Sequence, residues 1–298
     1  MKKVSRKDYL KAFLTVAVCI AVFIVIYAVN EDFFGKNQLN KKNIADQTFV
    51  RFIDVGQGDS ILVYSKGHCA LVDTGVSSAW NSVYNEFKNI GTERIDALVV
   101  THLDSDHSGG LAKICDNFAV SNLILPELSV ESEGITAAEY AINSVTSSAG
   151  QTYTAKPGMN FDIGDFEITV LAQFSNMPDE NNRSTVMMVK AGDIKFLLTG
   201  DIEAKTERLL LGENLNLKCD VLKVAHHGSA GSSSEDFLKA ASPKFAVISV
   251  GSDNVYGHPH NKTLANLEYY GAKLYRTDLN GNITFYINDG KLSPYTER

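Results

Sequence analysis

Cysteine is scarce in this sequence, with four residues in 298. Cys19 lies within a long apolar run, and the other three, Cys69, Cys115 and Cys219, are widely separated. This spacing excludes a disulfide-based scaffold and contains no paired cysteine pattern of a zinc site. At most one disulfide bridge is possible, and we expect free thiols buried in the fold.

An excess of positive charge is also lacking, because 28 lysine and arginine residues face 35 aspartate and glutamate residues, for a net charge of -7. A chain this acidic does not bind nucleic acid through its general surface charge. The sequence has no repeat period, no serine-nucleophile elbow and no dinucleotide-binding fingerprint. We therefore expect no nucleotide cofactor, and an anionic substrate would need a local positive charge such as a bound metal.

The N-terminal region is predicted to anchor the chain in a membrane. Residues 12–29 contain no charged residue, and as a helix they cover about 27 Å, close to the roughly 30 Å of a bilayer core. Residues 1–11 carry five basic residues against one acidic residue, which predicts a cytoplasmic tail. The membrane is then a partner, and the remaining chain lies outside the cell. A cleaved signal peptide, leaving a secreted protein, is the alternative, although Ala28-Val29-Asn30 matches a cleavage site poorly.

Residues 30–47 are polar and are expected to form a linker, and residues 48–298 one folded α/β domain. With 44% hydrophobic and 21% charged residues, the chain is neither disordered throughout nor collagen-like nor a coiled coil. Short β-branched runs alternate with amphipathic stretches, a pattern typical of sheets packed between helices. The predicted strands are residues 49–55, 60–64, 69–73, 95–102, 122–125, 166–172, 185–191, 194–200, 220–226, 245–251, 273–277 and 282–287. The predicted helices are residues 78–88, 111–117, 136–145, 203–211, 234–241 and 262–270.

The segment THLDSDHSGG is the densest group of metal-capable side chains in the sequence. It places His102, Asp104, Asp106 and His107 directly after a buried strand pattern. The C-terminal ends of strands are where α/β folds present loops to ligands. A turn held by aspartate side chains is the alternative, but two histidines and two aspartates before a glycine pair favour a metal site.

Three later loops carry further candidates, each after a strand pattern. Asp201 can bridge two metals, with a helix cap as the alternative role. Adjacent residues on a strand point to opposite faces, so of His226 and His227 we expect one to bind metal and the other to face substrate. His258 is a further candidate for the site, and His260 a weaker one.

These motifs together resemble the metallo-β-lactamase superfamily. THLDSDHSGG corresponds to its H-x-H-x-D-H signature, VDTG (residues 72–75) to its first aspartate motif, Asp201 to its bridging aspartate and His227 to its late histidine. The resemblance implies a four-layer αββα sandwich and a metal-dependent hydrolase. Asp73, in the VDTG motif, is expected to support a metal ligand rather than to bind metal itself.

One departure makes the resemblance more specific, because Asp104 stands where the superfamily has its second histidine. With FIDVGQGDS (residues 52–60), HHGS (residues 226–229) and YGHP (residues 256–259), it is similar to the hydrolase domain of the ComEC-type competence DNA-uptake family. The channel proteins of that family carry many membrane spans. Since this chain has one predicted span, the transport role is not carried over.

The resemblance implies two metal sites that share one aspartate. The first site would be held by His102, Asp104 and Asp201, and the second by Asp106, His107, Asp201 and His227. Three carboxylates with three imidazoles make a hard ligand set, so manganese, iron or magnesium are candidates beside zinc, with zinc or manganese preferred. Two divalent ions would outweigh the three carboxylates by one positive charge, which suits a phosphodiester better than a neutral ester.

Further roles follow from the same comparison. The third histidine motif of the superfamily is missing, and Asn182 or Ser184 stands in its place, to complete the first site weakly or orient a water. Asp106 is expected to position the attacking water, and His226 or His258 to hold phosphate oxygens and protonate the leaving group.

Outside these candidates, Asp54 and Asp59 are interpreted as turn and support residues and His68 as a surface residue. The function predicted from the sequence is a membrane-anchored metal-dependent phosphodiesterase or nuclease, with DNA as one possible substrate. Hydrolysis of a cell-wall phosphoester or a lactone is an alternative, and a non-catalytic, metal-dependent surface binding module is another. Hydrolysis of β-lactams does not follow, because a fold does not fix its substrate.

Overall fold

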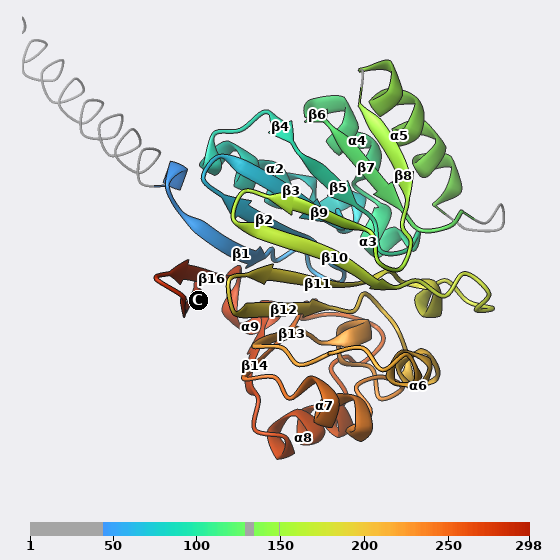
Figure 1. The fold of residues 1–298 in the computed structure, drawn as a ribbon, viewed down its shortest axis with the longest axis vertical. Coiled ribbons are helices and arrows are strands. Elements are labelled where there is room, and N and C mark those ends of the chain that lie inside the picture. The colour runs from blue at the N-terminus through green and yellow to red at the C-terminus, as the bar shows by residue number, and fades with distance from the viewer. Residues whose placement is uncertain (1–43, 129–133, 149) are drawn as a thin grey trace, which may run out of the picture. The chain divides into compact units, whose positions relative to one another are not determined.

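The structure, a computed structural model, describes residues 44–128, 134–148 and 150–298 (Figure 1). The chain divides into two units, Met1–Ile44 and Ala45–Arg298, and the sheets and their helices belong to the second. The predicted anchor at residues 12–29 and most of the predicted linker lie outside the described residues. Within the described ranges, no helix is long and apolar enough to cross a membrane.

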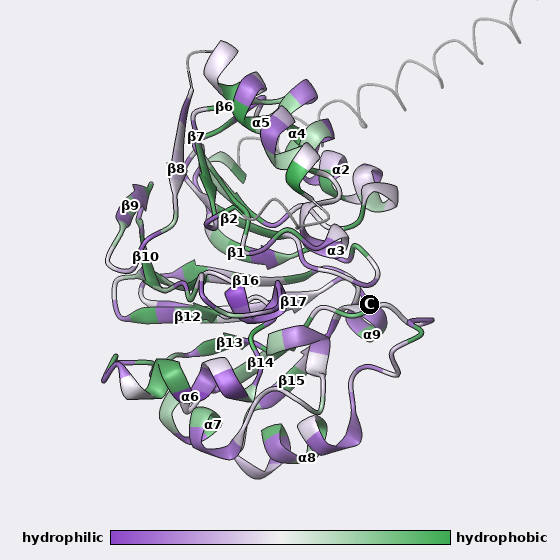
Figure 2. Ribbon diagram, turned by 90° about the vertical axis from the view of Figure 1, so that its right-hand side faces the viewer, coloured by the Kyte–Doolittle hydropathy of each residue, from purple (hydrophilic) through white to green (hydrophobic). Residues whose placement is uncertain are grey.

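Two β-sheets face each other at the centre of the second unit (Figures 1 and 2). The first sheet has eight strands in the order β17-β16-β1-β2-β3-β5-β7-β8, and the second has seven in the order β15-β14-β13-β12-β11-β10-β9. The strands of the first sheet are β1 (Thr48–Phe52), β2 (Ile61–Ser65), β3 (His68–Val72), β5 (Ala97–Val99), β7 (Asn122–Leu125), β8 (Gln151–Thr154), β16 (Ile283–Asn288) and β17 (Lys291–Thr296). The strands of the second are β9 (Asn160–Ile163), β10 (Phe166–Ala172), β11 (Val186–Ala191), β12 (Ile194–Leu198), β13 (Val221–Lys223), β14 (Phe245–Ile248) and β15 (Lys273–Arg276). A two-stranded ladder of β4 (Arg94–Ile95) and β6 (Ala119–Val120) stands apart.

Helices cover both outer faces of the paired sheets (Figures 1 and 2). The helices on the side of the first sheet are α2 (Trp80–Ile90), α4 (Leu111–Asn117) and α5 (Ile135–Ser147). Those on the side of the second are α6 (Ala204–Gly212), α7 (Glu235–Ala241) and α8 (Asn261–Tyr269). Short helical segments complete the unit: α3 (Ser105–Ser108), α9 (Thr277–Asn280), η1 (Ser77–Ala79), η2 (Asn181–Arg183) and η3 (Ala225–Gly228). The layers are therefore αββα, as the resemblance implied.

The main core lies between the two sheets, because alternate residues of each strand point toward the other sheet. In β10 the side chains at the alternating positions Phe166, Ile168 and Val170 are buried. Phe285 of the first sheet packs edge-on against Phe196 of the second, with ring centroids 6.0 Å apart. Full burial of each such side chain stabilises the fold by about 1.5–3 kcal/mol. A second apolar cluster joins the second sheet to its helices.

Each predicted element has a counterpart in the structure, but several bounds differ and some elements were not predicted. The bounds of α4 and β7 are those predicted, whereas β6, β8, β9, β17, α3 and α9 are short elements that the hydrophobic pattern did not indicate. The predicted strand at residues 220–226 is wrong in its second half, because β13 ends at Lys223. His226 and His227 instead have φ of 50° and 52° in a tight left-handed turn, so they are not alternating residues of a strand.

Parallel pairing brings the candidate loops to one edge of the sandwich. β3, β5 and β7 run parallel in the first sheet, and β12 to β15 run parallel in the second. The carboxyl ends of parallel strands meet at the same edge of a sheet, which is where ligands bind in such folds. The loops after β3, β5, β12, β13 and β14 carry the predicted site residues, except for Asn182 and Ser184, which lie in the connection between β10 and β11.

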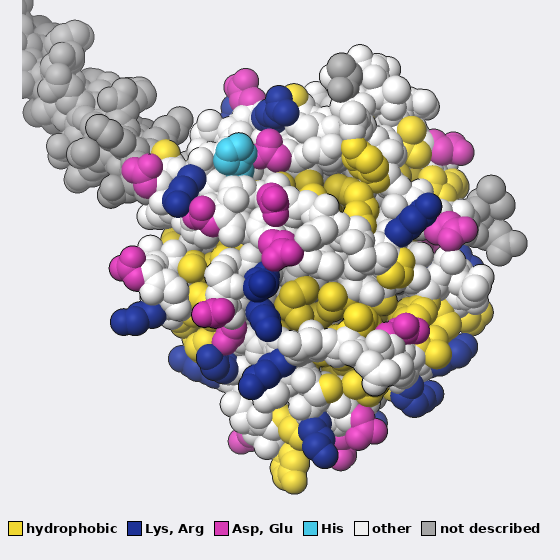
Figure 3. Space-filling model, in the orientation of Figure 1, with side chains coloured by type: hydrophobic (Ala, Val, Ile, Leu, Met, Phe, Trp, Pro, Cys, Tyr) yellow, Lys and Arg dark blue, Asp and Glu magenta, His cyan; other side chains and the backbone are white. Residues whose placement is uncertain are grey.

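The face of the molecule drawn in Figure 1 carries an apolar patch and charges of both signs. Figure 3 shows apolar side chains near its middle, with acidic and basic side chains around them. A cavity of about 260 Å³ is lined there by residues of the edge strands, including Tyr153 and Phe161. Because charges of both signs are mixed on this face, it offers no one-sided positive surface to a polyanion.

Candidate metal centre

The loop after β5 is held from below by a buried carboxylate. Asp73, which is fully buried, accepts hydrogen bonds from the Thr101 backbone nitrogen at 2.7 Å and the Thr101 hydroxyl at 2.8 Å. The same carboxylate lies 2.8 Å from Nδ1 of His107. This contact orients the His107 ring so that Nε2 points into the site, which is how carboxylates commonly support metal-binding histidines. Asp73 therefore lies where the sequence interpretation expected a supporting residue.

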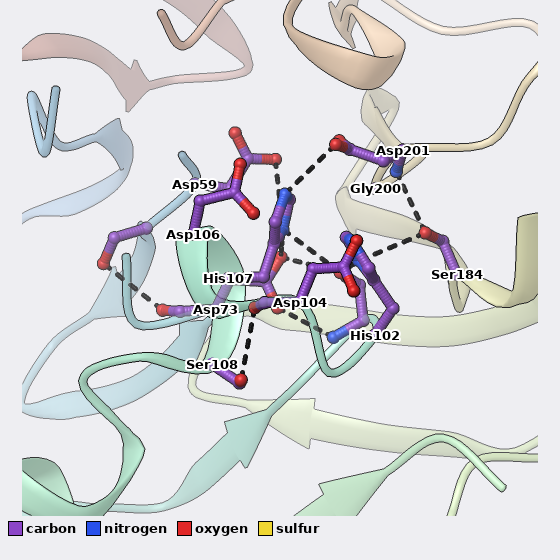
Figure 4. A network of polar contacts seen from close by, with 12 residues as sticks. Asp59, Asp73, His102, Asp104, Asp106, His107, Ser108, Ser184, Gly200 and Asp201 are labelled. Atoms are coloured by element: carbon purple, nitrogen blue, oxygen red, sulfur yellow. Dashed lines mark hydrogen bonds and ion pairs between the residues drawn. The ribbon is translucent and has the colours of Figure 1, made fainter. Parts of the chain in front are cut away.

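Four side chains from three loops, His107 among them, converge at one point. Asp106, His107, Asp201 and His227 each offer one ligand atom, and these atoms all lie within 4.8 Å of one another. The Asp201 carboxylate oxygen Oδ2 lies 3.3 Å from Nε2 of His107 and 3.1 Å from Nε2 of His227. Oδ2 of Asp106 lies 3.2 Å from the same His227 nitrogen. Asp201 is thus central to the cluster, and Figure 4 shows its carboxylate beside the His107 ring.

His102 and Asp104 lie at the edge of this cluster (Figure 4). The His102 ring centroid is 4.1 Å from that of His107, and its Nε2 is 3.7 Å from Oδ2 of Asp104. His102 is completely buried, whereas about a third of the Asp104 side chain is exposed. The six residues predicted to bind metal are therefore brought into one group.

The site contains buried polar atoms that make no hydrogen bond within the described protein. They are Nε2 of His102, His107 and His227 and Oδ1 of Asp201. Buried polar atoms nearly always make hydrogen bonds, whereas Nε2 of His107 and His227 only face the Asp201 carboxylate as ion pairs, so this convergent set of atoms is suited to a further partner. Imidazole nitrogens and carboxylate oxygens at this spacing are the donor set of a divalent metal ion, and the residues present fit that ligand.

Ser184 and Asn182 have structural partners. The Ser184 hydroxyl accepts a hydrogen bond from the Asp201 backbone nitrogen at 3.0 Å and lies 3.3 Å from Nδ1 of His102, so it contacts two site loops from behind. Gly200 passes so close to Ser184 that a side chain on it would meet the serine at 2.7 Å. The Asn182 amide oxygen accepts from the backbone nitrogen of Glu203 and the hydroxyl of Thr206, which places it at the start of α6.

His226 and His258 lie together outside the converging cluster. Their rings meet edge-to-face at a centroid distance of 5.4 Å. Nδ1 of His226 lies 3.4 Å from a carboxylate oxygen of Glu203, and the His226 side chain is about one-fifth exposed. His260 accepts a hydrogen bond from the Ala230 backbone nitrogen through Nδ1, so it braces the loop.

In the metal-free protein, nearby carboxylates favour the protonated forms of two predicted ligands, His227 and His107. Burial lowers the pKa of His227, but the carboxylates of Asp201 and Asp106 outweigh it and raise that pKa to about 9. Burial likewise opposes protonation of His107, yet Asp201 and Asp73 raise its pKa well above the usual value. Two imidazolium ions thus balance the carboxylates in the absence of metal.

The pKa values of three other predicted ligands, His102, Asp104 and Asp106, are also shifted by the surroundings of the site. Burial, followed by the charge of His107, lowers the pKa of His102 to about 3, so this imidazole is neutral and free to bind. Burial and the neighbouring Asp106 raise the pKa of Asp104 to about 6. Burial would raise the pKa of Asp106, but its contact with His227 holds it at about 2.

The sequence interpretation missed the partner of Asp59. Asp59 is buried, as is Lys223 of β13, and their side chains form an ion pair with a distance of 2.8 Å. The signal in the sequence was a lysine in the middle of the apolar run VLKVA. By contrast, the interpretations of Asp54 and His68 are confirmed. Asp54 accepts from the Gly56 backbone nitrogen in a turn, and the His68 side chain is 61% exposed.

The described cysteines are free, as expected. Cys69 and Cys219 are buried and Cys115 is half-buried. Burial raises the pKa of each thiol to about 12, so none is a thiolate at neutral pH.

The sequence of this chain matches a known protein superfamily. The sequence profile of the metallo-beta-lactamase superfamily matches residues 53–252, and the chain belongs to this superfamily. Among solved structures, the fold is similar to that of the metallo-beta-lactamase fold protein YhfI from Bacillus subtilis, with a TM-score of 0.52. The two are 13% identical in sequence, and the match covers 76% of this chain and 95% of that one.

Two bacterial competence proteins are more similar in sequence. The chain is 33% identical over 256 residues to ComE operon protein 3 of Bacillus subtilis, a match covering 79% of this chain and 32% of that protein. It is 35% identical over 239 residues to the competence protein ComA of Neisseria gonorrhoeae, covering 80% of this chain and 32% of that protein. The chain therefore spans about a third of the length of these relatives. The ComEC-type resemblance seen in the motifs is confirmed.

Proposed function

We propose that this chain is a metal-dependent phosphodiesterase that uses two divalent ions, zinc or manganese. The observation that carries the proposal is the convergence of four buried ligand atoms, from His102, His107, His227 and Asp201, that make no hydrogen bond within the described protein. Sequence similarity to competence proteins favours a nucleic acid as the substrate. When bound, the ions supply an activated water and offset the negative charge that develops at phosphorus.

The residues around the metals have distinct tasks in this proposal. Asp106 lies at the cluster with about a quarter of its side chain exposed, so it can orient a water as well as bind metal. His226 is the stronger candidate for protonating the leaving oxygen, because Glu203 lies beside its Nδ1. Burial and the neighbouring His226 lower the pKa of His258 to about 4, so a neutral His258 donates a hydrogen bond to a phosphate oxygen.

An exposed aromatic residue at the rim favours a substrate with a planar ring. The Tyr256 ring stacks on that of His258 with centroids 5.6 Å apart and planes inclined by 24°, and 62% of the residue is exposed. Asn254 braces this loop by bonds to the backbone of Gly251 and His258. A nucleobase can stack on such a ring, and base–aromatic stacking contributes about 1–3 kcal/mol.

The second candidate is hydrolysis of a cell-wall phosphoester such as a choline phosphate. The same Tyr256 ring favours it to a lesser degree, because quaternary ammonium groups also bind aromatic faces. Lactone hydrolysis and a non-catalytic binding role have no comparable support. Two bound divalent ions would exceed the charge of Asp104, Asp106 and Asp201 by one, which would attract an anion rather than a neutral lactone. A full set of metal ligands favours catalysis over binding alone.

A screen of three substrates tests these alternatives. Metal-reconstituted protein is assayed with bis-p-nitrophenyl phosphate, single-stranded DNA and p-nitrophenyl phosphorylcholine. We expect cleavage of the first two, and Tyr256→Ala should reduce kcat/KM on DNA by about 5–100-fold, the loss of one stacked base. Tyr256→Phe is the matched control and should retain activity on DNA. Exclusive cleavage of the phosphorylcholine substrate would instead support the second candidate.

We further propose that residues 12–29 anchor the chain in the cell membrane with the catalytic domain outside. The support is the charge-free run and the basic residues before it. This placement would give the enzyme access to extracellular substrates.

A further inference from the structure

Lys223 is a buried cation that the proposed reaction does not use. The residue is fully buried on β13, and its ammonium group donates to the Val224 carbonyl oxygen at 2.9 Å and to Oδ2 of Asp59 at 2.8 Å. Burial of a lysine is costly unless it is paired, and here it cannot reach a substrate. Lys223 can therefore act on the site only through its partner, Asp59.

The loop that carries Asp59 contacts the other loops of the site. The Asp59 backbone nitrogen donates to the Asp106 carbonyl oxygen at 3.1 Å, and its carbonyl oxygen accepts from Gly75 at 2.8 Å. Gly58 passes so close to Asp106 that a side chain at this position would meet the Asp106 carbonyl oxygen at 2.2 Å. The Gln57 side chain accepts from the backbone nitrogen of Gly251, at the start of the loop that carries His258. The FIDVGQGDS motif thus touches the loops on both sides of the site.

The Asp59 side chain reaches the rear edges of two predicted ligands. Its Oδ1, which makes no hydrogen bond within the described protein, lies 3.7 Å from Nδ1 of His227. Its Oδ2 lies 4.0 Å from Nδ1 of His107 (Figure 4). His107 belongs to a loop of the first sheet, whereas His227 follows β13 in the second. One carboxylate therefore lies behind imidazoles from both halves of the sandwich.

We propose that Asp59 and Lys223 are a positioning pair that joins the two halves of the metal site, so that metal affinity depends on residues that do not touch the metal. The Lys223 ammonium holds Asp59 in place and compensates its charge. Nδ1 of His107 faces Asp73 at 2.8 Å, and Nδ1 of His227 faces the Ser249 carbonyl oxygen at 2.8 Å. Without Lys223, the Asp59 carboxylate is free to move toward these Nδ1–H groups, to compete with both contacts and to turn the rings. Supporting contacts of this kind commonly change metal affinity by about 10–100-fold. The inference rests on the metal site of the proposed function but not on its substrate.

Variants of two ion pairs test the inference, one fully buried and one largely buried. Lys223→Met removes the cation at similar length, and Arg51→Met is the matched control. Arg51 pairs with Glu86 and donates to Thr284, between β1 and α2, and none of these residues belongs to the site. Zn²⁺ and Mn²⁺ affinities are measured by competition with a fluorescent chelator, below the unfolding temperature of each metal-free variant. We expect affinity to fall by about 10–100-fold in Lys223→Met and to stay within about twofold in Arg51→Met.

A double variant keeps the test valid if Lys223→Met does not fold. Asp59→Asn with Lys223→Met removes both charges at nearly constant volume, and buried pairs replaced in this way commonly remain folded. We expect this protein to fold but to bind metal at least tenfold more weakly than the wild type. Wild-type affinity in the double variant, or equal affinities in Lys223→Met and Arg51→Met, would overturn the inference. Because the readout is metal affinity, failure of the phosphodiesterase proposal would not change this result.

Discussion

At the scale of single residues, the proposed metal ligands lie apart from the histidines proposed to face the substrate. Nε2 of His227 lies 3.1 Å from the central carboxylate of Asp201, whereas His226 turns toward Glu203 and His258. Their separation depends on the left-handed turn at both histidines, which places neighbours in the sequence on different sides of the site.

Alanine variants of these residues should therefore differ in kind. His227→Ala and Asp201→Ala should lose both bound metal and activity, because they remove central ligands. His226→Ala should keep its metal but lose about 10²–10⁴-fold in rate on a diester whose leaving group needs a proton. A p-nitrophenolate ester, which leaves without protonation, should lose much less. Metal analysis and paired rate measurements check this, and loss of metal from His226→Ala alone would reverse the assignment.

The protons held by the metal-free site predict how metal binding depends on pH. The pKa of His227 is raised to about 9, and a metal binds only the neutral imidazole. Affinity should therefore rise with pH, by up to about tenfold per pH unit for each proton displaced, and level off above pH 9. Titrations with Zn²⁺ at pH 6.5, 7.5 and 8.5 in a metal buffer measure the slope. Affinity that does not change over this range would contradict the assignment of a protonated His227.

The chemistry of single residues was largely predictable from the sequence, and their supports were not. The spacing of THLDSDHSGG was sufficient to propose four ligands, because the residue types themselves bind metal. The pair of Asp59 and Lys223 joins residues far apart in the chain, and only the fold shows that two buried charges meet. For the same reason, the partners of Asn182 in the start of α6 could not be foreseen.

At the scale of elements, the loops of the site depend on close backbone approach. Gly58 has φ of +131° and lies against the Asp106 carbonyl oxygen, so Gly58→Ala forces both strain and a clash. We expect the free energy of unfolding to fall by about 2–4 kcal/mol and metal affinity to fall with it. Gly192→Ala is the control, because Gly192 has φ of +58° and no atom within 4 Å, and it should cost only about 1 kcal/mol. If urea unfolding gave equal losses of unfolding free energy for Gly58→Ala and Gly192→Ala, the close contact with Asp106 would not contribute to stability.

The longer helices and the central strands followed from local patterns, whereas the turns and the edge strands β8, β9 and β17 did not. The strand at Asn122–Leu125 and the helix at Leu111–Asn117 were predicted with their observed bounds, because their apolar residues are buried at the spacing that each kind of element requires. The run VLKVAH continues to look like a strand, but the chain turns at Ala225 to bring His227 beside Asp201. Contacts with distant loops outweigh the local preference at that position.

At the scale of the whole molecule, the uneven charge of the chain predicts its orientation. The basic residues before residues 12–29 should remain in the cytoplasm, which places the catalytic domain outside the membrane. Protease added to intact protoplasts should therefore digest the domain, while a cytoplasmic marker protein stays protected. Complete protection of the domain would contradict this orientation, and its quantitative release into the medium would indicate cleavage of the anchor.

Reconstitution with metal shows whether hydrolysis by this protein depends on a bound divalent ion. The purified protein is stripped with a chelator, its metal content is checked by elemental analysis, and hydrolysis of bis-p-nitrophenyl phosphate is measured after addition of single metals. The hard ligand set of Asp104, Asp106 and Asp201 with three histidines predicts recovery of activity, with more from Mn²⁺ than from Mg²⁺ or Ca²⁺. Asp201→Ala should not recover under the same conditions. Undiminished hydrolysis by protein shown to be free of metal would contradict the account.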